Sequence, residues 1–192
     1  MRLPEVDDAT PIEDADVAVA QKVVRFADHP VVETIGEISD FSDQEPLYAA
    51  TGAVIATGLL MRDAKTVKAG TRMLAAHLLA TALRGIVKQL VDRTRPDAAA
   101  REGEYHMSAG ERYERDFNSF PSGHTAGALA VALAFSREYP GQAPIAFTLA
   151  GAAGAAQVVR CSHFPSDVAA GAVVGAVAEA AVDRLIRWAE RI

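Results

Sequence analysis

The stretch Phe120-Pro-Ser-Gly-His124 is the starting point for interpreting this sequence. Two other unusual segments are best explained if they lie next to it in the folded chain. It stands where a long apolar segment begins, and Ser122 suits the N-cap of a helix. Gly123 would let a ligand approach the backbone, and the free amides of a helix N-terminus attract anions. We therefore predict an anion site here, with His124 in the first turn, where it can give a proton to a leaving oxygen.

The first of the two segments lies upstream, where Lys88 and Arg95 are seven residues apart. On a continuous helix these two cations share one face about two turns apart, and together they attract an anion. Pro96 closes the helix, since proline removes an amide and restricts the residue before it. Taken alone, the pair also fits two solvated cations at a helix end.

The second segment lies downstream, where His163 and Asp167 are four residues apart across Phe164-Pro165-Ser166. Pro165 suits the first turn of a helix, which would put His163 just before that helix and Asp167 inside its first turn. We expect the carboxylate of Asp167 to hold one imidazole nitrogen and leave the other free as a nucleophile. A surface histidine followed by a helix-capping acid is the alternative for this segment alone.

Length and composition narrow the class of protein. A chain of 192 residues most simply forms one domain, and a net charge of −6 makes nucleic acid an unsuitable partner. The single cysteine, Cys161, excludes an intrachain disulfide and a cysteine-rich metal framework. The N-terminus is acidic and lacks the basic-then-apolar order of a secretory signal. The local cations must therefore serve a small ligand.

Apolar periodicity predicts an all-α fold with about five to six core helices. Residues 1–45 are expected to form an acidic arm and an amphipathic helix over 15–27, and residues 46–192 a helical catalytic domain. No strand is expected. The charged stretch 97–120 is predicted to be a long loop facing the substrate. The core helices are predicted over 47–61, 66–91, 122–135, 143–160 and 166–192.

Several features favour a bundle embedded in a membrane. The segments include four or five uncharged runs, and glycine and alanine recur at spacings that permit close helix contact. Basic residues fall at the helix ends opposite the predicted site, as the positive-inside rule would place them. Against this stand the shortness of the runs and a mean hydropathy of only +0.09. We expect a multi-pass membrane protein whose active site faces away from the cytoplasm. The basic residues at those ends are Arg62, Lys65, Lys68, Arg72, Arg137, Arg184, Arg187 and Arg191.

The three segments together resemble, in order and spacing, the signature of the type 2 phosphatidic acid phosphatase (PAP2) superfamily. The resemblance covers about residues 47–185 and implies a helical, metal-independent phosphatase that needs no cofactor. By this resemblance His163 attacks phosphorus to form a phosphohistidine, Asp167 orients it, and His124 protonates the leaving group. The resemblance also implies which residues hold the phosphate oxygens: Lys88, Arg95 and the backbone of Ser122 and Gly123.

The sequence departs from the family pattern at one place. The third motif normally begins Ser-Arg, with its arginine six positions before the nucleophilic histidine, and here the two residues are Ala156 and Gln157. Glutamine cannot form a charged bidentate pair with phosphate. Arg160 lies three residues before His163, and on a continuous helix the two would point in similar directions. We expect Arg160 to supply the missing phosphate-binding cation; its alternative is an ordinary cation at a helix end.

The expected substrate is a phosphate monoester or diphosphate on a lipid or polyprenyl carrier. One alternative is a soluble acid phosphatase with the same site chemistry. Another is a degenerate, non-catalytic member that binds phosphorylated lipids, although the three groups that break the bond are all present. A vanadate-dependent haloperoxidase shares the family site, but those chains are much larger. The oligomeric state and the natural substrate stay open.

Overall fold

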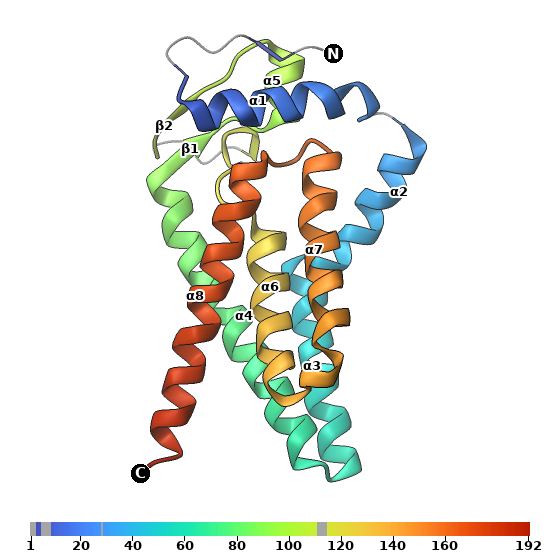
Figure 1. The fold of residues 1–192 in the computed structure, drawn as a ribbon, viewed down its shortest axis with the longest axis vertical. Helices are drawn as coiled ribbons and strands as arrows, with labels where there is room; N and C mark the ends of the chain where they lie inside the picture. Colours follow the sequence, from blue (N-terminus) through green and yellow to red (C-terminus); the bar gives the residue numbers. More distant parts are fainter. Residues whose placement is uncertain (1–2, 5–8, 28, 111–114) are drawn as a thin grey trace.

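The computed structural model of the chain describes residues 3–4, 9–27, 29–110 and 115–192. Long helices run side by side along the molecule in Figure 1, and α6 lies in the middle, in contact with α4, α7 and α8. The predicted helical bundle is thereby confirmed. The long helices are α3 (Gln44–Met61), α4 (Ala64–Leu90), α6 (Gly123–Glu138), α7 (Ala143–Val159) and α8 (Pro165–Ala189).

Small residues allow α4, α6 and α8 to pack closely. A Cβ atom added to Gly175 of α8 would lie 2.4 Å from the carbonyl oxygen of Ala126 in α6, so no larger residue fits there. The buried core between these helices contains more alanine than any other residue type, which is how three helices of moderate hydropathy can approach one another. Its fully or nearly buried members are Met73, Ala76, Ala80, Ala130, Ala134, Ala178 and Val182.

Two shorter helices precede the bundle. Helix α1 (Pro11–Val23) lies across one end of it, and α2 (Pro30–Ser39) runs obliquely beside α7 (Figure 1). The helix α1 starts earlier than predicted because Thr10 and Glu13 form a capping box. Leu3 is buried against Ala20, so part of the predicted arm packs on the body; residues 1–2 and 5–8 lie outside the described part.

The segment predicted as a charged loop contains regular structure, and this prediction was wrong in part. Helix α4 already ends at Leu90, so Arg95 does not share a continuous helix with Lys88, and Pro96 begins helix α5 (Pro96–Glu102) instead of closing a helix. Strand β1 (Val91–Arg93) pairs antiparallel with β2 (Met107–Ala109), although no strand was expected. Three residues a side are too few to produce a visible alternation. Short 3₁₀ helices complete the described structure: η1 (Val24–Phe26), η2 (Asp40–Ser42), η3 (Arg115–Phe117) and η4 (Pro140–Gln142).

Large apolar side chains remain exposed on the outer faces of the bundle. By length and hydropathy, one stretch among the described residues, Pro140–Val159, is suited to crossing a membrane. The other long helices carry charged residues within or close to their apolar runs, which lowers their mean hydropathy. The exposed apolar residues include Leu59, Leu60, Leu78, Leu149, Val173 and Trp188.

Candidate active site

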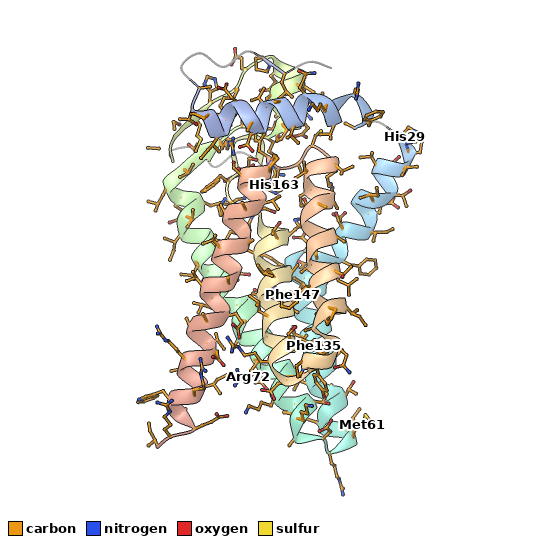
Figure 2. The ribbon with its side chains drawn as sticks, viewed as in Figure 1. His29, Met61, Arg72, Phe135, Phe147 and His163 are labelled. Atoms are coloured by element: carbon orange, nitrogen blue, oxygen red, sulfur yellow. The ribbon has the colours of Figure 1, made fainter. Side chains whose placement is uncertain are left out.

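The three motifs meet at the end of the bundle that α1 covers. His163 lies there in Figure 2, far from Arg72 and Met61 at the opposite end. A pocket of about 680 Å³ opens at this end. Its lining comes from the α2–α3 junction, α4, the start of α6 and the α7–α8 connection. The residues that line it are Asp40, Asp43, Gln44, Glu45, Pro46, Arg84, Arg95, Gly123, His124, Gln157, Arg160, Ser162 and His163.

His163 is held with one ring nitrogen bonded and the other free within the part of the chain that the structure describes. Its Nδ1 lies 2.6 Å from the carbonyl oxygen of Ser119, which can only accept a hydrogen bond, so Nδ1 carries the proton and Nε2 keeps its lone pair. The side chain is 3% exposed. Burial lowers the pKa of His163 well below its ordinary value, and the charges of Arg95 and Lys88 act in the same direction. The imidazole is therefore neutral at physiological pH.

Asp167 does not hold His163 in the way that the sequence suggested. Its Oδ2 is 3.9 Å from Nδ1 of His163, too far for a hydrogen bond. Instead Oδ2 accepts from the hydroxyl of Ser119 at 2.5 Å and from the amide of Phe164 at 2.8 Å, while Oδ1 accepts from Arg93 at 2.7 Å. Asp167 is thus connected to His163 through Ser119, a residue that the sequence did not single out.

The start of α6 has the predicted cap. Ser122 is the N-cap of α6, and its hydroxyl accepts from the amide of Thr125 at 3.4 Å. Its own amide donates to the carbonyl oxygen of Asp167 at 3.0 Å, and the residue is fully buried. The prediction that the Ser122 backbone holds phosphate therefore does not fit, because its amide is already used. Gly123 and His124 line the pocket, and their contacts with the phosphate and the leaving group stay predictions.

Of the two cations of the first motif, Arg95 faces the pocket more directly. Arg95 lines the pocket and donates to the backbone carbonyls of Ser162 and Asn118 at 3.3 and 3.5 Å. Lys88 is half-buried and does not line the described pocket, although its charge affects His163. The predicted contact of Lys88 with phosphate would therefore require its side chain to move.

Arg160 lines the pocket but is already engaged. Its Nη1 donates to Asp40 at 2.6 Å, to Ser39 at 3.0 Å and to the carbonyl oxygen of Gly36 at 3.2 Å. Gln157, at the usual arginine position, is 1% exposed and also donates to Ser39, at 3.2 Å. Both residues therefore tie α7 to the end of α2, and Arg160 would have to share its guanidinium with Asp40 to bind phosphate.

Arg84 is the pocket cation that the sequence reasoning missed. A Cβ atom added to Gly123 would lie 2.6 Å from Cζ of Arg84, so the guanidinium rests directly on the start of α6. Its Nε is buried and has no hydrogen-bond partner among the described residues. A buried donor without a partner costs free energy unless a ligand satisfies it. The spacing of four residues between Arg84 and Lys88 was the available signal, because it places both on one helix face.

The rim of the pocket is acidic. Asp40, Asp43 and Glu45 are exposed, whereas Arg84 and Arg95 lie deeper. Nε2 of His124 is 3.9 Å from the nearest carboxylate oxygen of both Asp40 and Asp43. Burial lowers the pKa of His124 below its ordinary value, and the charges of Arg160 and Arg84 act in the same direction, while the carboxylates of Asp43 and Asp40 oppose them. The pocket therefore has a basic floor and an acidic rim, with His124 between them.

Known proteins resemble this chain in sequence and in fold. It is 34% identical over 116 residues to a lipid A 1-phosphatase of Porphyromonas gingivalis, a match that covers 56% of this chain and 22% of the relative. The chain thus spans about a fifth of the length of that relative. The crystal structure of Aquifex aeolicus LpxE matches with a TM-score of 0.65 and 21% identity over 93% of this chain and 98% of that one.

A second solved structure is a transmembrane PAP2 type phosphatidylglycerolphosphate phosphatase from Bacillus subtilis. It matches with a TM-score of 0.67 and 23% identity over 94% of this chain and 88% of that one. Both structural matches show a shared fold. The sequence model of the PAP2 superfamily matches residues 69–191, which is more than half of the chain and includes all three motifs. The chain belongs to the PAP2 superfamily.

Proposed function

We propose that this chain is a phosphatase that hydrolyses a phosphate ester on a lipid carrier through a phosphohistidine intermediate, without a metal ion. The observation that carries the proposal is the meeting of His163 with His124, Arg84 and Arg95 around one pocket, at the N-terminus of α6. Phosphoryl transfer needs positioning and charge stabilisation more than covalent help from the protein. Two guanidinium groups and a helix N-terminus supply both.

In the proposed reaction Nε2 of His163 attacks phosphorus, and a P–N bond forms as the P–O bond to the carrier breaks. His124 gives its proton to the departing oxygen. A water molecule then attacks the phosphohistidine while His124 takes up a proton from it, which breaks the P–N bond and restores both histidines. Arg84 and Arg95 hold the remaining phosphate oxygens throughout, and Arg84 takes the place of the cation that Gln157 cannot provide.

A second, apolar pocket supports a lipid as the carrier. It has a volume of about 770 Å³ and lies between α2, α3, α6 and α7. Ser39 lines it and also accepts hydrogen bonds from Gln157 and Arg160, which line the phosphate pocket. The two pockets are therefore neighbours, so a phosphorylated head group and an acyl chain of one molecule could be bound together.

The same features support a place in the cell membrane. Exposed leucines, valines and a tryptophan surround the bundle, and they would contact lipid rather than water. We infer a multi-pass arrangement in which the pocket faces away from the cytoplasm, because the basic helix ends lie at the opposite end of the molecule. One of the similar solved structures is a transmembrane PAP2 type phosphatase, which supports a membrane location.

The acidic rim favours a phosphate monoester over a diphosphate. In the proposed reaction the leaving group lies beside His124, which is 3.9 Å from carboxylate oxygens of Asp40 and Asp43. The leaving group of a monoester is an alcohol and is neutral once protonated. The leaving group of a diphosphate is itself a phosphate, and these carboxylates would repel it. A monoester is therefore the better substrate class.

The test is release of inorganic phosphate by detergent-solubilised protein in EDTA, from a short-chain phosphatidic acid and from a polyprenyl diphosphate. We expect release from the monoester, a loss of at least about a thousandfold in kcat for His163→Ala, and change within about twofold for the control His106→Ala. The His106 side chain is half exposed and lies outside the pocket. An acid-labile phosphoenzyme should form in the wild type and not in His163→Ala. Folded wild type that releases phosphate from neither substrate would favour the non-catalytic, lipid-binding alternative.

A further inference from the structure

Helix α1 lies outside the residues that the family model matches, yet it places a buried carboxylate next to the site. Asp16 is 3% exposed. It accepts from Nη2 of Arg93 at 2.7 Å, from the amide of Ser166 at 3.0 Å and from the hydroxyl of Ser166. Figure 1 shows α1 crossing over the end of the bundle where α8 begins. A charged side chain buried this deeply needs such partners, and Arg93 is the charged one.

Arg93 connects Asp16 to the catalytic carboxylate. Its guanidinium donates through Nη1 to Asp167 at 2.7 Å and to the hydroxyl of Ser166 at 2.7 Å, and through Nε to Tyr105 at 3.0 Å. It is 1% exposed and stacks on the ring of Phe164, with Cζ 4.3 Å from the ring centre. A planar guanidinium held on every edge has one orientation, so each partner fixes the position of the others.

The contacts continue from Asp167 to the nucleophile. Asp167 accepts from the hydroxyl of Ser119, and the carbonyl oxygen of Ser119 accepts from Nδ1 of His163. The amide of Ser119 also donates to the carbonyl oxygen of Arg93 at 3.0 Å. Arg93 therefore contacts Ser119 directly through its backbone, and its side chain reaches Ser119 by way of Asp167. Every member of this series is 3% exposed or less, so water cannot replace a lost contact.

We infer that Asp16 is a positioning residue for the phosphatase reaction: through Arg93, Asp167 and Ser119, it fixes the ring of His163 with Nε2 facing the pocket. This inference rests on the proposed function. Holding α1 in place does not require the carboxylate, because Ala20 and Val24 already pack against Phe164 and Cys161. The charge of Asp16 instead balances a guanidinium that would otherwise pair with Asp167 alone.

The test uses the full chain with the variants Asp16→Asn, Asp167→Asn and both together. We expect Asp16→Asn to lower kcat about 10- to 100-fold with KM unchanged, as for other residues that support a catalytic group indirectly. Asp14→Asn is the matched control: it removes a carboxylate from the same helix, where the side chain is exposed. In the Asp167→Asn background, adding Asp16→Asn should lower kcat by less than a further threefold, because the contacts that lead from Asp16 to His163 are already interrupted.

Two results would overturn the inference. One is equal loss from Asp16→Asn in both backgrounds, which would mean that Asp16 acts independently of Asp167. The other is an unchanged kcat in Asp16→Asn. If Asp16→Asn does not fold, Tyr105→Phe replaces it in the same cycle, because it removes one hydrogen bond to Arg93 without removing a charge. The losses of kcat from Tyr105→Phe and Asp167→Asn should then also fail to add up in the double variant, though the effect is smaller. Additive losses would again overturn the inference.

A measurement that does not depend on turnover separates this inference from the proposed function. Ring ¹⁵N NMR of His163 reports which nitrogen carries the proton. The wild type should show the Nδ1–H tautomer, and Asp16→Asn should show a mixture of both tautomers. Identical ring spectra in the two proteins would overturn the positioning role even in an active enzyme. Conversely, the expected change of tautomer in a protein that hydrolyses no phosphorylated lipid would leave the positioning role standing and remove the proposed reaction.

Discussion

Both ends of the bundle contain buried charges, but the two ends arrange them differently. At the end away from the pocket, Arg72 pairs with Glu138 and Asp183, each at 2.9 Å, and Arg137 pairs with Glu179 at 2.5 Å. At the pocket end, Nε of Arg84 has no hydrogen-bond partner among the described residues. Nε of Arg72 and Oδ2 of Asp183 also lack a hydrogen bond in the described part of the chain, but each lies within 3.2 Å of an oppositely charged group. Arg84, at the other end, still has capacity for a ligand.

The difference separates a structural use of charge from a functional one. Closed ion pairs hold helices together, and their value lies in the cost of removing one partner. An unsatisfied guanidinium does not stabilise the fold, and it is retained where an anionic ligand completes its contacts. Substitutions of the far-end pairs should therefore affect stability and spare catalysis, and substitution of Arg84 should do the reverse.

The largest effect on stability is expected from Arg72→Met. This change leaves Glu138 and Asp183 without their closest buried partner, which should lower the free energy of unfolding by about 3 kcal/mol. Asp183 keeps Arg137 at 3.2 Å and also Arg187, which places the loss at the low end for a buried pair. The measurement is denaturant unfolding in detergent, together with kcat at a temperature where both proteins are folded.

Arg184→Met is the matched control, because Arg184 is exposed and follows Asp183 in α8. We expect it to change stability by less than about 0.5 kcal/mol. If Arg72→Met lowered kcat under conditions where all of the protein is folded, the division between a structural end and a functional end would be wrong.

The next effect is expected from Arg84→Gln, which should lower kcat/KM about a hundredfold and change stability little. Loss of a charge-assisted contact made in the transition state typically costs about that much. Arg160→Gln is the comparison: its guanidinium is paired with Asp40 at 2.6 Å, so we expect a loss of less than about tenfold. Steady-state rates on a phosphate monoester measure both variants. The opposite order would make Arg160 the principal replacement for the family arginine.

The helices and the three motifs could be predicted because their signals are local. Apolar periodicity, the proline at 165 and the cap at Ser122 each depend on residues close in sequence. The pairing of β1 with β2 could not be seen, because each strand has only three residues. The structure therefore changes the predicted ends of the helices more than their predicted order.

The supporting contacts of the site could not be predicted, because they join distant residues. Arg93 is 77 residues from Asp16 and 74 from Asp167, and no spacing rule connects positions so far apart. The sequence did suggest that Asp167 orients His163, but it could not show that Ser119 stands between them. Likewise, the spacing of Arg160 suited a phosphate-binding role, and only the structure shows that its guanidinium already pairs with Asp40.

A smaller effect is expected from pH. Because the pKa of His163 is lower in the folded protein than in the unfolded chain, the unfolded chain takes up the proton first as pH falls below about 6.5. Its contribution to stability is therefore complete above that pH and is lost below it. Unfolding of His163→Gln should depend less steeply on pH between about 7 and 5 than unfolding of the wild type. Equal slopes would mean that His163 is protonated as easily in the folded protein.

The smallest effect is expected from Lys68→Gln, which removes an ion pair at the same end as Arg72. Lys68 is 2.7 Å from Glu190, a shorter distance than either pair of Arg72, but the two side chains are 43% and 52% exposed. Water already solvates both groups, so the loss should be below about 1 kcal/mol. Comparing its unfolding with that of Arg72→Met asks whether distance or burial decides what an ion pair contributes. A loss of unfolding free energy as large as that of Arg72→Met would mean that burial does not distinguish these two ion pairs. The contrast between the two ends of the bundle would then rest only on the unsatisfied guanidinium of Arg84.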